Sequence, residues 1–329
     1  MFNELATLTH KSYIEITVTN NDQNDYTNAP VFADIPTSLV RILGCSLSEM
    51  KLVDENGNPI TFWPDANGAG EIYPGYQSIW FRIDLPASGT RTLNLVCDPQ
   101  NPSATTNPTD VVDIYYDFNQ IPQGSDTDGD VRIDSSLYLD PPASLYLPNV
   151  NNVDSSQYNI LRFPITVYDR FIAKINIMLS DQAAGGLLTG WTGSSLANPL
   201  IWIGSTSYTG CGTNIGYYNG SYQVLGQVPT DGKWHRYLVY ARNDQANFDL
   251  YLDNQLLGSS LQYASSLATL TSGQTQYLEE FETVATCNPN RHDDSFVYVQ
   301  ASYDTLPTVS VNPIIGIDDS CITRSLSTF

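Results

Sequence analysis

The stretch from Gly232 to Gly258 reads GKWHRYLVYARNDQANFDLYLDNQLLG, and it decides the fold class. Two apolar runs, 234–241 and 248–252, lie on either side of a short polar segment. Short runs rich in aromatic and branched residues, bounded by polar turn residues, are typical of strands. Asp253-Asn254 then supplies a tight turn, because Asn tolerates the left-handed backbone conformation. The stretch therefore predicts consecutive antiparallel strands joined by short turns.

The same pattern recurs along the whole chain. Between Tyr13 and Asn20, the side chains of Ile14, Ile16 and Val18 share one face and polar side chains share the other, as in a half-buried strand. Further runs of this kind cover residues 79–85, 91–97, 159–167, 171–179, 200–204, 296–301 and 314–322. Strands at short spacing, without an amphipathic helix of useful length, predict an all-β chain of antiparallel β-sandwiches.

A proline-rich segment divides the chain. Residues 98–109 contain three prolines and almost no apolar side chain, so they are expected to form a stiff linker rather than a central strand. We therefore predict a small β-sandwich spacer or assembly domain at 1–98, a linker at 99–110 and a larger domain at 111–329. The runs of the larger domain follow no fixed period, which argues against a propeller or a solenoid.

The five cysteines cannot all pair within one chain. A bridge between Cys45 and Cys97 is one option for the first domain. Buried free thiols are the alternative, because Cys is among the most buried residue types.

Charge and composition narrow the class of partner. The 329 residues carry 35 acidic and 14 basic side chains, a net charge of −21 that repels phosphate backbones, so nucleic acid is not an expected partner. No run approaches the roughly 20 apolar residues of a membrane span, so no membrane insertion is expected. Only 15% of the residues are charged, and uncharged polar residues dominate instead. That balance is typical of a secreted or particle-forming protein, and the acidic excess fits an acidic medium in which carboxylates are partly protonated.

The first ten residues, MFNELATLTH, lack the basic and apolar regions of a secretory signal. Two explanations stay open: a trimmed start, or a virion protein that leaves the cell with its particle.

The segment from Gly232 to Gly258 resembles the most recognisable part of laminin-G-like and concanavalin A-like domains. In that family a G-x-W-H strand leads through a turn to an L-Y-x-D-G-x-L hairpin, matched here by Gly232, Trp234 and His235 and then by Leu250 to Leu256, with Asn254 in place of the usual Gly. The C-terminal segment 315–326 is similar to the family's closing strand. The resemblance implies a concanavalin A-like jelly roll over about 111–329, in which Trp234 fills the core.

The first domain resembles a small sandwich module that often precedes such lectin-like domains. The matching features are the opening strand 13–20, the turn at 52–57 and the strand pair 78–86 and 90–96.

The sharpest local motif is acidic. Asp126, Asp128 and Asp130 alternate around a glycine in GSDTDGDVRID (124–134), and carboxylates at such spacing suit a hard cation such as Ca²⁺. The motif departs from an EF-hand, since its glycine precedes the third Asp and Leu137 replaces the bidentate Glu. A plain acidic turn is the alternative.

Aromatic residues cluster between Trp191 and Tyr222. Sugar recognition combines aromatic rings with amide and hydroxyl hydrogen-bonding groups. The predicted ligand-binding residues are Tyr208, Tyr217, Tyr218 and Tyr222, whereas Trp202 is expected in the core. Asn219-Gly220-Ser221 also forms a glycosylation sequon, which matters only in a glycosylating compartment.

Catalysis has one candidate strand. Glu280 and Glu282 alternate in YLEEFET (277–283), as paired carboxylates do in concanavalin A-like glucanases, but the family's spacing of four residues with an intervening Asp is missing. Of three histidines, His235 is expected to be a packed strand residue and His292 to lie in a polar loop. The alternative for His292 is a metal site with its neighbours Asp293 and Asp294. No catalytic residue is therefore predicted.

These observations predict a non-enzymatic virion-surface or cell-surface protein that is structural, binds host-surface glycans, or both. Its partners would be such glycans or other surface proteins, and homo-oligomers are compatible with this role. The alternatives are a secreted polysaccharide hydrolase and a purely structural assembly protein without a ligand.

Overall fold

The computed structural model describes residues 12–65, 71–128, 131–139, 142–147, 158–166, 168–183, 185–191, 201–204, 211–262, 275–283 and 291–314. They form two compact units. Unit 1 holds the described residues up to Asp65, residues 75–111 and those from Tyr303 onward, and unit 2 holds residues 71–74 and 112–302. Every pairing between their named strands is antiparallel, which confirms the predicted all-β class.

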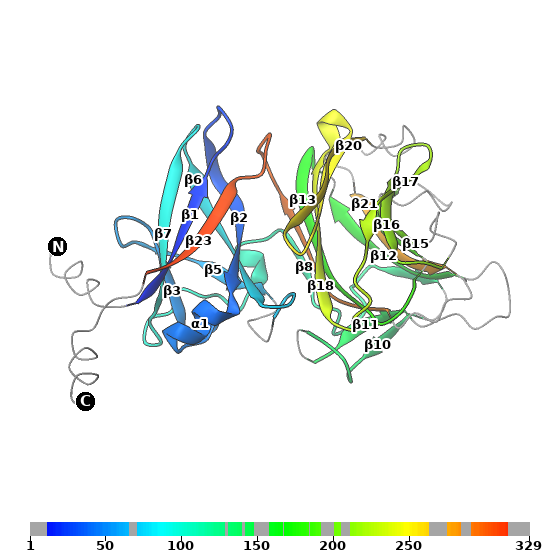
Figure 1. Cartoon of the computed structure of the whole chain (residues 1–329), viewed down its shortest axis with the longest axis horizontal. Coiled ribbons are helices and arrows are strands. Elements are labelled where there is room, and N and C mark those ends of the chain that lie inside the picture. Colours follow the sequence, from blue (N-terminus) through cyan, green and yellow to red (C-terminus); the bar gives the residue numbers. More distant parts are fainter. Residues whose placement is uncertain are drawn as a thin grey trace, which may run out of the picture. The chain divides into compact units, whose positions relative to one another are not determined.

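Unit 1 consists of two sheets (Figure 1). The larger sheet follows the order β23 (Thr308–Ile314), β1 (Tyr13–Thr19), β7 (Thr90–Cys97), β3 (Met50–Val53) and β4 (Pro59–Ile60). The smaller sheet follows the order β2 (Tyr26–Pro36), β6 (Tyr76–Leu85) and β5 (Phe62–Pro64). The short helices are α1 (Thr37–Leu43), η2 (Leu47–Glu49) and η4 (Pro108–Asp110). None of the described helices is long and apolar enough to cross a bilayer.

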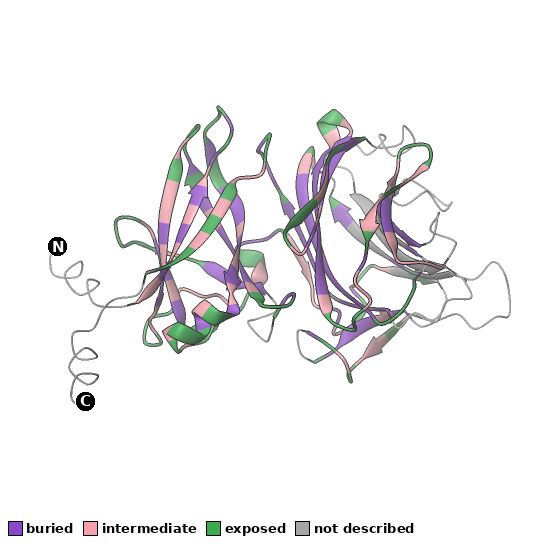
Figure 2. Ribbon diagram, viewed as in Figure 1, coloured by how far each residue is buried: buried purple, intermediate pink, exposed green. Residues whose placement is uncertain are grey.

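The alternation predicted for β1 is confirmed. Ile14, Ile16 and Val18 are at most 1% exposed, whereas their polar neighbours are half-buried. Figure 2 shows the burial of each residue on the strands of this unit. Large side chains of unit 1, such as Trp63 and Trp80, are also at most 1% exposed.

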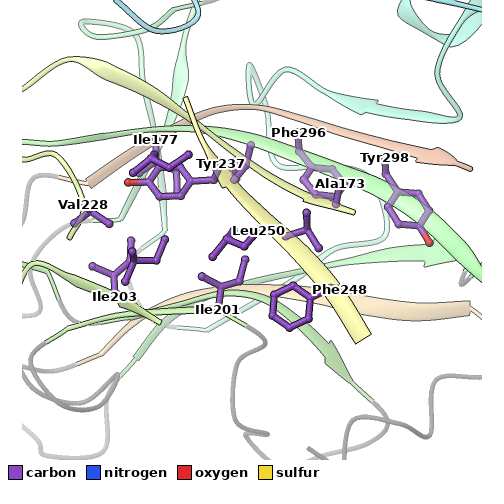
Figure 3. Packing of buried hydrophobic residues seen from close by; sticks show 14 of the residues in the cluster. Ala173, Ile177, Ile201, Ile203, Val228, Tyr237, Phe248, Leu250, Phe296 and Tyr298 are labelled. Atoms are coloured by element: carbon purple, nitrogen blue, oxygen red, sulfur yellow. The ribbon is translucent and has the colours of Figure 1, made fainter. Parts of the chain in front are cut away.

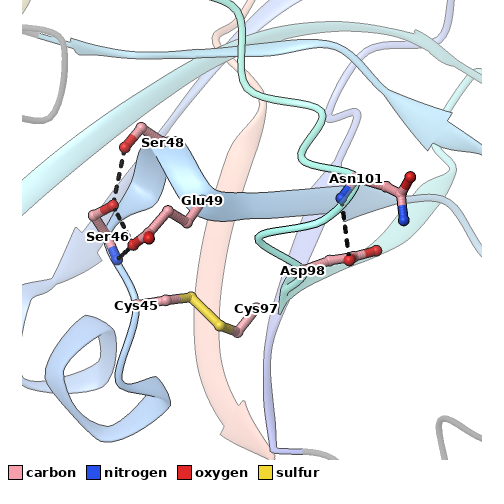
Figure 4. The surroundings of a disulfide bond; sticks show 7 residues. All are labelled: Cys45, Ser46, Ser48, Glu49, Cys97, Asp98 and Asn101. Carbon is pink, nitrogen blue, oxygen red and sulfur yellow. Dashed lines mark hydrogen bonds between the residues drawn. A yellow bond between two sulfur atoms is a disulfide. The ribbon is translucent and has the colours of Figure 1, made fainter.

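A disulfide links Cys45 to Cys97, one of the two options that the sequence left open, with a Cα separation of 6.1 Å (Figure 4). Cys45 precedes the capping box of η2, in which the backbone N–H of Ser46 donates to the Glu49 carboxylate at 2.9 Å. The disulfide therefore joins the residue before η2 to the end of β7. Cys211, in unit 2, is also disulfide-bonded.

The predicted domain boundaries are wrong at two places. The final strand, β23, pairs with β1 over seven residues and belongs to unit 1, so unit 2 is inserted between the strands of unit 1. The predicted linker also belongs to unit 1. The backbone N–H of Phe62 donates to the carbonyl of Ser103 at 3.2 Å, and Thr105 donates back to Phe62 at 2.7 Å. Proline 102 precedes this pairing and does not prevent it.

Unit 2 is a sandwich of two sheets. The order in the eight-stranded sheet is β10 (Arg132–Asp134), β11 (Ser144–Leu147), β22 (Arg291–Gln300), β13 (Arg170–Leu179), β18 (Trp234–Arg242), β19 (Asn247–Leu252) and β20 (Gln255–Gln262), and β8 (Ile114–Tyr116) also pairs with β22. The order in the seven-stranded sheet is β17 (Tyr222–Gln227), β16 (Asn214–Tyr218), β15 (Ile201–Gly204), β14 (Gly185–Trp191), β21 (Thr275–Thr283), β12 (Tyr158–Thr166) and β9 (Asp126–Asp128). A short helix, η5 (Asn243–Gln245), connects β18 to β19.

Alternate residues of both sheets form a single hydrophobic core (Figure 3). Ile201 and Ile203 come from the seven-stranded sheet, and Tyr237, Leu250 and Phe296 come from the eight-stranded one. All five are at most 2% exposed. Burial of this apolar surface, at roughly 25 cal/mol per Å², is the main force that holds the two sheets together.

Candidate functional site

The β16–β17 hairpin carries the candidate binding residues. Tyr218 and Tyr222 lie opposite each other in its register, and Asn219, Gly220 and Ser221 connect them. Gly220 has φ of 109°, a conformation that favours glycine. All three connecting residues are exposed, so the hairpin ends in a tight polar tip flanked by two tyrosines.

The rings of Tyr218 and Tyr222 contact each other. Their centroids are 5.0 Å apart at an interplanar angle of 58°, and both residues are half-buried. Tyr222 also meets Trp202 edge-on, with centroids 5.8 Å apart and an angle of 90°. Val224, two residues further along β17, is 55% exposed. Since alternate residues of a strand share a face, Tyr222 and Val224 lie on the same side of β17. The group of Tyr218, Tyr222 and Val224 is called the tyrosine face below.

Trp202 lies beside Tyr222 on the same face of the seven-stranded sheet. It lies between the core residues Ile201 and Ile203 in β15, so its indole is on the opposite side of the sheet from the core. The indole is fully buried, and its Nε1–H donates to the carbonyl of Tyr217 at 3.2 Å. Tyr222 therefore contacts a buried, hydrogen-bonded partner. The burial predicted for Trp202 is confirmed.

Gly216 makes the approach of this indole possible. A Cβ atom at position 216 would lie 2.7 Å from two atoms of the Trp202 indole and against the carbonyl oxygen of Gln223. Only glycine leaves the space in which the indole packs against β16. Glycine at position 226 on β17 is different, because a Cβ there would meet nothing closer than 3.9 Å.

Tyr218 packs partly against the core, and so does Tyr217, another predicted ligand-binding residue. The ring of Tyr217 packs against Phe248 of the core, with centroids 6.0 Å apart at an angle of 77°. The predicted residue Tyr208 lies outside the described residues. Of the four predicted tyrosines, the structure thus brings together Tyr218 and Tyr222.

The tip beside the tyrosine face is polar. The side-chain amide of Gln223 donates to the hydroxyl of Ser221 at 2.7 Å, and Asn219 lies beside them at the tip. Aromatic rings next to amide and hydroxyl groups can bind the apolar face of a sugar ring and its hydroxyl groups at the same time. This arrangement can hold a carbohydrate without any catalytic group.

The acidic motif starts with a strand. Asp126 and Asp128 are the ends of β9, which pairs with β12, and Asp130 and the side chains of the other two lie outside the described residues. Among the residues that the structure describes, no group of three His, Cys, Asp or Glu side chains could hold a metal ion. The predicted calcium site stays a prediction, and no step below depends on it.

The acidic strand of the hydrolase alternative is β21. It lies between β14 and β12 in the seven-stranded sheet, and its residues Glu280 and Glu282 pair with Leu161 and Asn159. The side chains of both glutamates lie outside the described residues. The segment 277–283, considered as a candidate strand, does lie in a strand, β21 (Thr275–Thr283).

His235 joins two loops of unit 2. Its Nδ1 lies 2.5 Å from Oδ2 of Asp253, in the β19–β20 turn, and its Nε2 lies 3.0 Å from Oδ1 of Asp231, in the loop before β18. Burial lowers the pKa of His235, but the hydrogen bonds and charges of Asp253 and then Asp231 outweigh it, so the pKa is raised above its ordinary value. Because each nitrogen faces a different carboxylate, the group acts as a structural bridge, as expected of a packed strand residue.

Two predictions were made from the segment Gly232 to Gly258, and only one of them is confirmed. The turn residues Asp253 and Asn254 have φ of 49° and 65°, which confirms the predicted left-handed turn with Asn in place of Gly. Trp234, predicted to fill the core, is only half-buried because it stands at the first position of β18. Trp202 occupies a fully buried position instead.

His292 was expected in a polar loop, but it lies within β22. Its neighbour Asp293 is fully buried and forms an ion pair with Arg291 at 2.7 Å. A buried carboxylate requires a charged partner. Arg291 and Asp293 can therefore both lie inside the sandwich, although the segment is polar in sequence.

Comparison with known proteins adds little beyond the fold. No known family profile and no curated protein sequence matches the chain. Similar solved structures include the potassium-bound Emp46p carbohydrate recognition domain, at 10% identity, 57% of this chain, 100% of that chain and a TM-score of 0.39. Lectin II from Ulex europaeus matches at 10% identity, 57% of this chain, 98% of that chain and a TM-score of 0.38. A carbohydrate esterase from the Shiga toxin-encoding bacteriophage phi24B matches at 13% identity, 55% of this chain, 91% of that chain and a TM-score of 0.36. At these scores the likeness carries no argument about function, and the sandwich of unit 2 rests on its own strand pairings.

Proposed function

We propose that this chain is a non-enzymatic, extracellular surface protein that binds carbohydrate at the tyrosine face of the β16–β17 hairpin. The contact between Tyr218 and Tyr222, the second of which also meets the buried Trp202, is the observation that carries this proposal. Two half-buried rings in mutual contact, one of which also meets the buried Trp202, offer apolar area at low entropic cost, since a tyrosine side chain has few rotatable bonds.

The chemistry of the tip fits a neutral sugar. The rings take the C–H face of the sugar, and the Ser221 hydroxyl and Asn219 amide at the exposed tip take its hydroxyl groups. A net charge of −21 disfavours sulfated or otherwise anionic glycans. We therefore expect neutral glycans to bind more tightly than acidic ones.

The disulfides support an extracellular setting. Cys45–Cys97 and the disulfide-bonded Cys211 are compatible with an oxidising compartment, and disulfides are rare in the cytosol. A cell surface or the surface of a virion meets this condition. The partners are then host-surface glycans or neighbouring surface proteins, including further copies of this chain.

A glycan array tests the proposal. The full chain is applied with and without calcium, together with the variants Tyr218→Ala and Tyr222→Ala. Each variant should weaken binding by about tenfold, a loss of about 1.4 kcal/mol, because it removes one ring from the sugar contact. Tyr138→Ala is the matched control, since Tyr138 is 40% exposed in the same unit and away from the hairpin in sequence. Loss of binding in the control, or none in the two variants, would refute the tyrosine face as the site.

The alternatives give different results in the same preparation. A polysaccharide hydrolase would release reducing sugar and lose this activity in Glu280→Gln or Glu282→Gln, which would overturn the non-enzymatic proposal. A purely structural protein would bind no glycan and would form concentration-dependent oligomers in ultracentrifugation. Binding that requires calcium would support the predicted calcium site at Asp126, Asp128 and Asp130.

A further inference from the structure

The sequence offers one usable acceptor for an N-linked glycan. Asn-x-Ser/Thr triplets occur at Asn101, Asn107 and Asn219. The first two contain proline at the middle position, as Asn-Pro-Ser and Asn-Pro-Thr, and proline at that position prevents glycosylation. The triplet Asn219-Gly220-Ser221 has glycine there and meets the requirement.

The structure places this triplet where a transferase can reach it. Its three residues form the exposed tip between β16 and β17. Attached glycans need such a surface position because they are bulky and hydrated. Gly220, with φ of 109°, makes the tight reversal that projects Asn219 at the end of the hairpin.

The acceptor amide and the sequon hydroxyl are already close together. The backbone N–H and the hydroxyl of Ser221 both donate to Oδ1 of Asn219, each at 3.4 Å. The folded hairpin therefore holds the two side chains that define the sequon on one side of a single turn. Asn101 and Asn107 give the opposite case, because their proline excludes them although the chain is exposed at both positions.

We propose that Asn219 is an acceptor site for an N-linked glycan. In this transfer the Nδ2 atom of Asn219 attacks the anomeric carbon of an oligosaccharide carried by a lipid diphosphate. The bond from nitrogen to carbon forms while the bond from that carbon to the diphosphate oxygen breaks. One amide proton passes to a base of the transferase, and the lipid diphosphate leaves with the electron pair. The proposal stands on the sequon and its exposure, and it does not require that the tyrosine face binds foreign glycans.

The test is the mass of the full chain secreted from a eukaryotic host behind a cleavable leader. We expect a glycan on the peptide that contains Asn219, removed by an amidase that leaves aspartate at position 219. Ser221→Thr should keep the glycan, whereas Asn219→Gln and Ser221→Ala should abolish it. The peptides with Asn101 and Asn107 should be unmodified and serve as internal controls. A secreted chain whose Asn219 is unmodified, or a glycan that persists in both Asn219→Gln and Ser221→Ala, would overturn the proposal. Because the readout is mass, its outcome is independent of any result from the glycan array.

Discussion

Replacement of His235 by glutamine tests how far one buried imidazole stabilises unit 2. His235 is 5% exposed, and its imidazole forms hydrogen bonds with Asp231 and Asp253 on two different loops. A hydrogen bond to a charged group contributes roughly 1.5–3 kcal/mol. The two carboxylates are 44% and 25% exposed, so solvent screens part of this energy. We expect His235→Gln to lower the free energy of unfolding by about 2 kcal/mol near neutral pH.

The pH dependence of this loss separates a charge effect from simple packing. The pKa of His235 is raised from 6.5, so its stabilisation is fully present below that pH and is lost as the pH rises through the higher pKa of the folded state. Burial raises the pKa of Asp231, but the hydrogen bonds from His235 and the Lys233 backbone outweigh this and lower it from 3.8. That part of the stabilisation is present above pH 3.8 and is lost as the pH falls through the folded value. The difference between the natural chain and the variant should therefore be greatest between these two limits.

Urea denaturation from pH about 5 to 9 measures this difference, and amide hydrogen exchange of the peptides around 231 and 253 localises it. Asp231→Asn is the matched variant, since it keeps a hydrogen-bond acceptor and removes the charge. A difference between His235→Gln and the natural chain that stays constant, or that grows as the pH rises, would refute the reasoning.

Three further outcomes are expected. Gly216→Ala should destabilise unit 2 by about 3 kcal/mol, because the new Cβ overlaps the indole and a carbonyl oxygen, whereas Gly226→Ala should be tolerated in the same thermal unfolding assay. Reduction of Cys45–Cys97, which are 52 residues apart, should lower the stability of unit 1 by about 4 kcal/mol in the loop-entropy estimate, and an unchanged unfolding midpoint would contradict it. If the tyrosine face binds sugars, chain glycosylated at Asn219 should bind the array more weakly than chain from which the glycan has been removed, because the attached sugar competes for the same rings.

The strands of both units were predictable because their signal is local. Alternation of Ile14, Ile16 and Val18 follows directly from one strand with one buried face, and the structure reproduces it. The Cys45–Cys97 bridge was one of two options, since cysteine spacing alone does not state which thiols lie together. The structure decides for the disulfide.

The sheet that β23 joins could not be predicted by the same reasoning. Its pairing with β1 joins Tyr13 to Ile314 across almost the whole chain, and no local pattern states which sheet a strand enters. The prolines of segment 99–110 led to the wrong prediction of a linker, because composition does not state which backbone groups form hydrogen bonds. Pro102 lacks an N–H, but the neighbours that bond to β5 are Ser103 and Thr105, so the segment pairs despite its composition.

The tyrosines of the candidate site show what the sequence could have decided. Neighbouring residues of a strand point to opposite faces, so Tyr217 and Tyr218 cannot both belong to one binding face. Ile215 is a core residue, and Tyr217 on the same face of β16 meets Phe248. Tyr218, although it is an alternate residue, is also half-buried and packs partly against the core. The register shift between Ile215 and Gly216 lies outside such reasoning, because a bulge has no simple sequence signal. The pairing of Tyr218 with Tyr222 was thus within reach of the pattern. The contact of the Trp202 indole with Tyr222 and its packing against Gly216 required the structure.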